Sequence, residues 1–284
     1  MPNPSKTETS DRNRQAGPAR LRVIMERRIS GTRTERRSNE RLAQDLVYEA
    51  MDAATAERRL DLAWQALELD PEQADALLMV LESIGMERGE RIEALRRIVA
   101  FAAKRLGKKA FKEFKPHFWG VLETQPYMRA RMELADELRA AGRLEEAIEE
   151  YEDMLLLCED DNLDVRHRLL PCLLALSRME EARRLLKLDA DEQGWNAAFA
   201  WGRVLERLLS GDEPGASQAL AAARKQNPYV ELYLTEPRKL PKKLPDSYSN
   251  GSKEEALCLA GPLLTAWQRF RESRVWLSAQ RKTD

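Results

Sequence analysis

The amino-acid sequence predicts an all-α protein built from helix pairs. Charged residues make up 33% of the chain and aromatic residues only 6%, a balance that suits helices with solvated outer faces better than sheets. A repeat is also visible, because a small residue stands five positions before an alanine in several places. The four instances are Gly89 with Ala94, Gly142 with Ala147, Ser177 with Ala182 and Gly211 with Ala216.

The spacing of these alanines indicates the type of repeat. Ala147, Ala182 and Ala216 follow one another at intervals of 35 and 34 residues. A period near 34 residues is that of the tetratricopeptide repeat, a helix–turn–helix unit whose copies stack into a curved solenoid. We therefore expect a tetratricopeptide-type right-handed α-solenoid of about five helix pairs, with an inserted helix and a C-terminal helical lid.

The first 40 residues differ in composition from the rest. Residues 1–40 carry ten Lys or Arg against five Asp or Glu, with Pro, Ser, Asn and Gly scattered among them. This pattern predicts a disordered basic arm. The arm is either a solubilising leader or a segment that contacts nucleic acid or an acidic partner. No aromatic residues interleave its arginines, so stacking on bases is not expected.

The solenoid is expected over residues 41–235. Pro71 ends the first pair because proline cannot continue a helix. Arg59 stands where later repeats carry alanine, which predicts looser packing in this end repeat. Pro171 should kink the first helix of the fourth pair. The pairs are expected at about residues 41–70, 73–106, 127–160, 162–188 and 194–227.

An insert interrupts the repeat after the second pair. Ala94 and Ala147 are 53 residues apart, which is one period plus a segment at about residues 107–126. Apolar residues recur there at steps of three and four, as on one face of a helix. We expect an extra helix, interrupted near Pro116, that packs across the groove or between repeats. The apolar residues are Phe111, Phe114, Phe118 and Leu122.

The last segment, residues 236–284, should close the solenoid. Prolines at every fourth position from Pro237 predict an extended strap. Ser252 and Glu255 have the spacing of a capping box that begins a helix, and Gly261-Pro262 should kink or restart that helix. An apolar face follows at Trp267, Phe270 and Trp276. Because the terminal repeat needs its outer edge covered, this segment is the predicted lid.

The sequence predicts no catalytic, metal or cofactor site. His117 and His167 are the only histidines, and each has one carboxylate a helical turn before it, too few ligands for a metal. The three cysteines form no CxxC pair, which indicates a reducing compartment. No glycine-rich phosphate loop, GxSxG or HExxH motif occurs. An enzyme with an unrecognised site is therefore the least favoured alternative.

The expected function is a non-catalytic scaffold that binds a protein or peptide segment in the concave groove. Arg129 and Arg139 could hold a partner carboxylate, and Trp201 could be an apolar anchor. Alternatively, these residues pair internally or pack on the inserted helix. The competing function is a nucleic-acid-associated regulator that acts through the basic arm. The predicted groove residues are Arg129, Met132, Asp136, Arg139, His167 and Trp201.

Location and partners follow from the apolar pattern and the charge. No apolar run approaches the ~20 residues of a membrane helix, and no secretion signal is visible. We expect a cytoplasmic protein without membrane insertion. The net charge of −1 does not favour nucleic acid as a partner of the whole chain.

Several segments resemble a known family. They are Ala43–Ala50, the stretch from His117 to Arg131, Asn227-Pro-Tyr-Val with Tyr233-Leu, and Gly251–Trp267. Together these segments resemble bacterial tetratricopeptide-repeat proteins that are related to the animal family named for suppression of tumorigenicity 7, over about residues 42–277. The resemblance implies the fold and brings no catalytic residues. The animal members are membrane proteins, whereas this sequence has no membrane segment, and Gly261-Pro262 falls where the family implies an unbroken helix.

Overall fold

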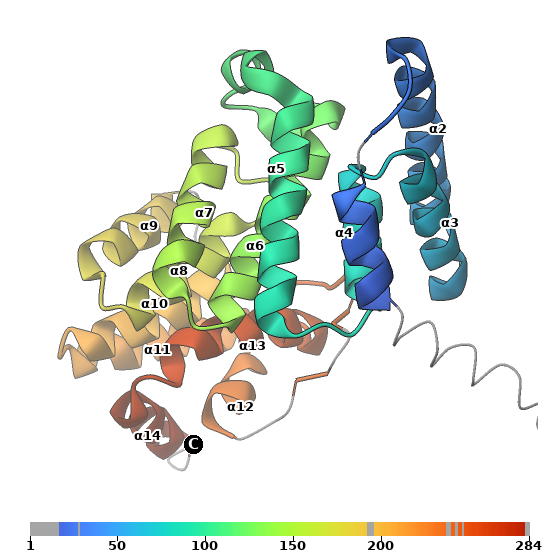
Figure 1. Ribbon diagram of the computed structural model, residues 1–284. Coiled ribbons are helices and arrows are strands. Elements are labelled where there is room, and N and C mark those ends of the chain that lie inside the picture. The colour runs from blue at the N-terminus through green and yellow to red at the C-terminus, as the bar shows by residue number, and fades with distance from the viewer. Residues whose placement is uncertain are drawn as a thin grey trace, which may run out of the picture. The chain divides into compact units, whose positions relative to one another are not determined.

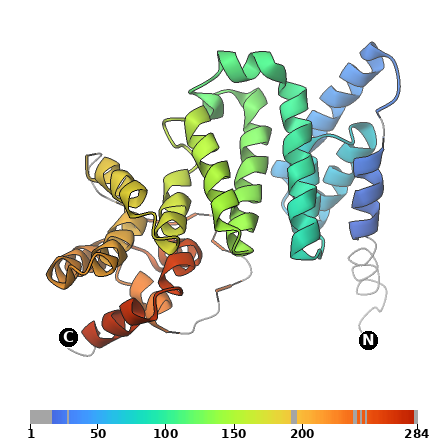
Figure 2. The same ribbon diagram turned by 60° about the vertical axis from the view of Figure 1, so that its left-hand side comes forward.

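The computed structural model of the protein describes residues 17–27, 29–191, 196–236, 240–241, 244–245 and 247–281. The chain divides into two compact units. The first unit is Met1–Glu137 with Leu156–Glu159, and the second is Leu138–Leu155 with Asp160–Asp284. Across the described ranges every named element is a helix, which confirms the all-α prediction (Figures 1 and 2). None of these helices is long and apolar enough to cross a membrane.

The first unit contains the helices up to residue 137. A helix at residues 17–26 precedes α2 (Arg33–Met51), α3 (Ala56–Leu69), α4 (Ala74–Ser83) and α5 (Arg88–Glu113). Two short 3-10 helices follow, η1 (Phe118–Gly120) and η2 (Leu122–Thr124), before α6 (Gln125–Ala140). The second unit contains α7 (Leu144–Leu157), α8 (Val165–Ala175), α9 (Met179–Asp191), α10 (Ala197–Leu209), α11 (Glu213–Gln226), α12 (Val230–Thr235), α13 (Lys253–Trp267) and α14 (Arg271–Gln280).

Three of the predicted helix pairs share one turn geometry. Gly142, Ser177 and Gly211 follow α6, α8 and α10, and all three have a left-handed backbone, with φ of 77°, 57° and 73°. In each turn the amide of this residue donates to the carbonyl three positions back, and the next amide donates to the carbonyl five positions back. This is the Schellman arrangement that ends a helix and reverses the chain. The alanine five residues later is fully buried in all three pairs.

The N-terminal prediction needs correction from residue 17 onward. Residues 17–26 are helical, and the side chains of Leu21, Ile24 and Met25 are buried. Arg97 of α5 donates to the carbonyl of Met25 at 2.6 Å. The first pair also begins earlier than expected, because Thr32 and Glu35 form a capping box that starts α2 at Arg33. Residues 1–16 of the expected arm lie outside the described residues.

The insert begins with a short helical segment at residues 108–113, which a kink at Gly107 separates from the rest of α5. α5 continues to Glu113 and changes direction at Gly107, where φ is 68°. Pro116 lies after the end of α5, and η1 and η2 follow. The rings of Phe111, Phe118 and Tyr127 pack together with centroids 5.2–6.1 Å apart. Phe111 and Phe118 of the predicted apolar face therefore pack together, but Phe118 lies in the 3-10 helix η1 and not on one continuous α-helix.

The C-terminal segment covers more than the last repeat. The capping contact at its start is present, with the Glu255 amide donating to Ser252 Oγ at 3.0 Å. α13 runs through Gly261 and Pro262 as one helix and packs on α8, α10 and α12, while α14 packs on α12 and α10 (Figure 1). Trp267 is fully buried. The strap residues 237–239, 242–243 and 246 lie outside the described residues.

The repeated turns predict opposite effects of two exchanges. Ser177→Gly should stabilise the fold by about 0.5–1 kcal/mol, because a residue with a Cβ is disfavoured in the left-handed region. Gly142→Ser should destabilise the fold by about 1 kcal/mol for the same reason. Nothing lies within 4 Å of a Cβ built on Gly142, so the effect comes from the backbone conformation and not from a clash. Thermal unfolding should show the two melting temperatures moving in opposite directions. Equal shifts of the same sign would contradict the turn assignment.

Candidate functional site

The six predicted groove residues lie on the first helices of their pairs. Arg129, Met132, Asp136 and Arg139 belong to α6, His167 to α8 and Trp201 to α10. Only the first three of the six belong to the first unit. The other three, Arg139, His167 and Trp201, belong to the second unit.

In the first unit, the guanidinium of Arg129 is already paired. Its Nε and Nη2 donate to Asp75 Oδ1 and Oδ2 at 2.7 and 2.8 Å. Asp75 lies on α4 and its side chain is only 3% exposed. The ring of Trp119 lies 5.8 Å from the guanidinium. The two-pronged contact that was expected to hold a partner's carboxylate thus joins α4 to α6, in agreement with the alternative of internal pairing.

The rest of this face is acidic. Met132 is buried, Asp136 is half-buried, and Glu133 keeps 53% of its side chain exposed. Desolvation by the surrounding protein raises the pKa of Glu133, and the charge of Asp136 adds to this effect. Arg91 opposes it, because its Nη2 lies 3.6 Å from Glu133 Oε2 while its Nε donates to Glu137 at 3.0 Å. The face of α4 and α6 therefore carries the carboxylate of Glu133, whose charge Arg91 of α5 neutralises only in part.

In the second unit, Trp201 is a core residue, and its assignment to the groove was wrong. Its side chain is fully buried and its Nε1 donates to the carbonyl of Asn227 at 3.1 Å. Arg139 donates from Nη1 to Thr265 Oγ1 of α13 at 3.3 Å. Because α13 packs on both α8 and α10, the face that these helices were expected to offer to a partner is covered by the chain itself.

A buried polar cluster around Asn227 holds the start of α13. The Nδ2 of Asn227 donates to Glu255 Oε2 at 2.7 Å and to the Ser252 carbonyl at 2.9 Å. Its Oδ1 accepts from the amide of Tyr229 at 3.0 Å, and Glu255 Oε2 also accepts from the amide of Gly251 at 2.7 Å. Asn227 is fully buried, so these bonds replace the water that its amide loses on folding. The repeat pattern gave no sign of this cluster.

His167 has a structural environment. Its Nε2 contacts the Nδ2 of Asn196, and its ring meets Phe199 edge-on with centroids 5.4 Å apart. Asn196 in turn caps α10 through the amide of Ala198 at 2.8 Å. Burial lowers the pKa of His167 to about 4, and this is partly opposed by the charge of Asp164. The imidazole is therefore neutral at pH 7.

The backbones of His117 and Cys158 pair in an isolated antiparallel bridge, which brings a histidine and a cysteine together without further metal ligands among the described residues. Within the described ranges, no three His, Cys, Asp or Glu residues are arranged to hold a metal ion. Cys158 and Cys172 are buried. Cys258 is half-buried, and burial raises the pKa of its thiol, which disfavours the thiolate.

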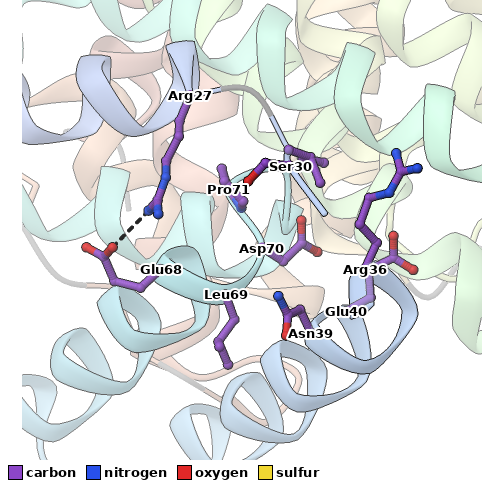
Figure 3. A pocket seen from close by; sticks show the side chains of 10 residues that line it. Arg27, Ser30, Arg36, Asn39, Glu40, Glu68, Leu69, Asp70 and Pro71 are labelled. Carbon is purple, nitrogen blue, oxygen red and sulfur yellow. Dashed lines mark hydrogen bonds and ion pairs between the residues drawn. The ribbon is translucent and has the colours of Figure 1, made fainter. Parts of the chain in front are cut away.

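A small polar hollow lies in the first unit between the segment before α2, the start of α2 and the end of α3 (Figure 3). Its volume is about 80 Å³, room for a few water molecules. Arg27 reaches Glu68 across it at 2.9 Å, and Arg105 binds the buried carboxylate of Asp70 at 2.5 Å. Three of the charged lining residues, Arg27, Glu68 and Asp70, are thus paired within the protein. Its lining residues are Arg27, Ile29, Ser30, Arg36, Asn39, Glu40, Glu68, Leu69, Asp70 and Pro71.

Comparison with known proteins supports the family resemblance at a distance. Protein ST7 homolog of Caenorhabditis elegans is 27% identical over 264 residues, which cover 78% of this chain and 48% of that protein. The chain thus spans about half the length of the curated relative it matches. No family model matches the chain. The relative's name states no activity or partner.

The low pKa of His167 predicts loss of stability in mild acid. The folded state keeps His167 neutral down to about pH 4, whereas the unfolded chain protonates it below about 6.5. Unfolding therefore takes up a proton in this window, and the free energy of unfolding should fall by about 3 kcal/mol as the pH drops through it. Urea unfolding at several pH values should show a smaller fall for His167→Gln. Equal pH slopes in the two proteins would show that His167 is not responsible.

The Arg129–Asp75 pair predicts strong coupling. Arg129→Ala should destabilise the fold by about 3–5 kcal/mol, because it leaves a buried carboxylate unpaired. The double variant with Asp75→Ala should cost less than the sum of the single variants. Arg143 and Glu146 form a matched control with two short hydrogen bonds at an exposed position, where coupling below about 1 kcal/mol is expected. Denaturant unfolding of both cycles measures the difference, and similar coupling in the two would refute it.

Proposed function

We propose that the chain is a non-catalytic scaffold of the tetratricopeptide type that binds a protein or peptide segment in the cytoplasm. The observation that carries the proposal is the repeated helix pair, with the same left-handed turn at Gly142, Ser177 and Gly211 and a buried alanine five residues after each. Stacked pairs of this kind present extended surfaces for other chains. The similarity to Protein ST7 homolog accords with this fold but does not name a ligand.

The binding face proposed for such a segment lies on α4 and α6 of the first unit. The corresponding face of α8 and α10 carries α13 instead. On α4, Leu78 and Met79 are half-buried and Glu82 is exposed, and on α6 Glu133 is exposed. A segment that brings an apolar side chain and a lysine or arginine would complement this surface.

The alternative of a nucleic-acid regulator receives less support. Arg20 and Arg27 of the expected arm both pair with Glu68, at 3.4 and 2.9 Å, and Arg22 pairs with Glu90 at 2.5 Å. Arg20 also lies over the ring of Trp64, 4.1 Å from its centroid. These arginines therefore serve to attach the helix at residues 17–26 to its own unit. Residues 1–16, also part of the expected arm, lie outside the described residues.

A charge reversal on the proposed face should separate binding from stability. Glu133→Lys should reduce the affinity for a bound protein segment by at least about tenfold, because the new charge repels a basic partner. Glu93→Lys is the matched control, since the side chain of Glu93 on α5 is 70% exposed and contacts Arg96 of the same helix. Partners are captured from native cells and identified by mass spectrometry, and their purified forms are then titrated calorimetrically. A partner that binds both variants and the wild type equally would refute this face as the site.

A further inference from the structure

The end of α5 and the residues directly after it carry concentrated positive charge. Residues 104–124 contain six Lys or Arg against two Glu, whereas the whole chain has a net charge of −1. Beyond Gly107 the helix turns away from the main axis of α5 (Figure 2). Lys108, Lys109, Lys112 and Lys115 lie on this last part of α5 or directly after it, and all four are exposed.

Most of this charge is not used by the protein's own structure. Lys104 and Arg105, before the kink, pair with Glu72 and Asp70. Lys109 makes only an exposed contact of 3.6 Å with Glu113. Lys108, Lys112 and Lys115 make no ion pair or hydrogen bond with any residue that the structure describes. Several arginines of the first unit, such as Arg27 and Arg129, pair with a carboxylate instead.

Buried contacts on its inner side hold the segment that carries the lysines. Ala110 is buried, and Phe111 packs on Phe118 and Tyr127 on the inner side. The hydroxyl of Thr124 donates to the carbonyl of Val121 at 2.8 Å. Because these contacts hold the backbone, the lysine side chains share an outward face without ordering of the main chain on binding.

An apolar side chain lies in the same segment. Leu122, the first residue of η2, is 69% exposed. Trp119 is half-buried, and its carbonyl accepts from Gln125 Nε2 at 3.0 Å. A large exposed leucine seven residues after Lys115 offers the apolar contact that protein interfaces combine with surrounding charges.

We propose that Lys108, Lys109, Lys112, Lys115 and Leu122, the lysine–leucine surface, bind an acidic protein segment that contributes an apolar anchor. The inference rests on the proposed scaffold function and adds a second surface of opposite charge to the face of α4 and α6. The four lysines complement Asp and Glu and accelerate encounter by long-range attraction. Leu122 supplies the contact that fixes the position of the bound segment.

Two other polyanions fit this surface less well. A single-stranded nucleic acid is usually held by exposed rings that stack on its bases, whereas the rings of Phe111, Phe118 and Tyr127 pack on one another. An anionic lipid surface would need a broad apolar face to insert, whereas Leu122 is the one large aliphatic side chain that is exposed among the described residues 104–124. The observations therefore favour a protein segment.

The test is a selection of peptides on the full chain. A displayed library of random dodecapeptides is panned on the wild-type protein and counter-selected on the triple variant Lys108→Glu, Lys112→Glu and Lys115→Glu. The selected peptides should be rich in Asp and Glu and contain a large apolar residue.

The triple variant should weaken their binding by at least about tenfold, Leu122→Ser should weaken it severalfold, and added salt should weaken it steadily. A control triple variant, Arg184→Glu, Lys187→Glu and Lys225→Glu, changes the same charge at exposed positions of the second unit and should bind like the wild type.

Each other outcome overturns the inference. Selected peptides that lack acidic residues, or that bind the lysine variant equally, refute the surface and leave the scaffold function standing. A selection that yields no peptide at all counts against both. Single-stranded oligonucleotides or phosphatidylserine-containing vesicles that bind through the lysines more tightly than the peptides do would identify a different partner. Sedimentation that shows lysine-dependent self-association would identify a second copy of the chain.

Discussion

The close approach of the two helices in each pair is the constraint on which the rest of this fold depends. The left-handed turn at Gly142, Ser177 or Gly211 reverses the chain within two residues, and an alanine where the helices meet keeps them close. A pair formed this way cannot bury its apolar face alone, so it must stack on the next. Successive first helices approach just as closely, since a Cβ on Gly202 of α10 would lie 2.6 Å from a methyl carbon of Leu170 of α8.

Stacking leaves one face of the second unit to be covered, and α13 covers it. Apolar contacts supply most of the free energy of such packing but do not fix direction or register. The polar cluster of Asn227, Glu255 and the backbone of Gly251 and Ser252 fixes where α13 begins, because each bond is lost if the helix shifts. Trp201 donates to the same loop through the carbonyl of Asn227. The expected groove and the expected lid are thus two sides of one interface.

What the sequence predicted correctly was local. The turns, the buried alanines and the cap at Ser252 depend on residues a few positions apart, and the prediction placed them well. The errors arose from contacts that are distant in the sequence. The basic composition of residues 1–40 outweighed the apolar run at Leu21–Met25. The helix there is held by distant residues, since Arg97 of α5 donates to the carbonyl of Met25 and Glu68 of α3 pairs with Arg20. Counting from the repeat alanines placed Trp201 on the concave side, but it could not show that α13 returns to cover that side. Arg129 was likewise assigned to a partner because Asp75 lies 54 residues away.

Internal pairing also determines which charges remain for a partner. Arginines join neighbouring helices by binding nearly buried carboxylates, as Arg183 does with Glu206 and Arg224 with Glu231. Such arginines are committed, because a carboxylate left alone in the interior is costly. The total number of charged residues is therefore a poor guide to a binding surface. The charged side chains that have no partner within the protein are a better guide. By that criterion the lysines after Gly107 qualify as a binding surface, since they are exposed and lie on a segment held by packed rings, and most of their charge has no partner among the described residues.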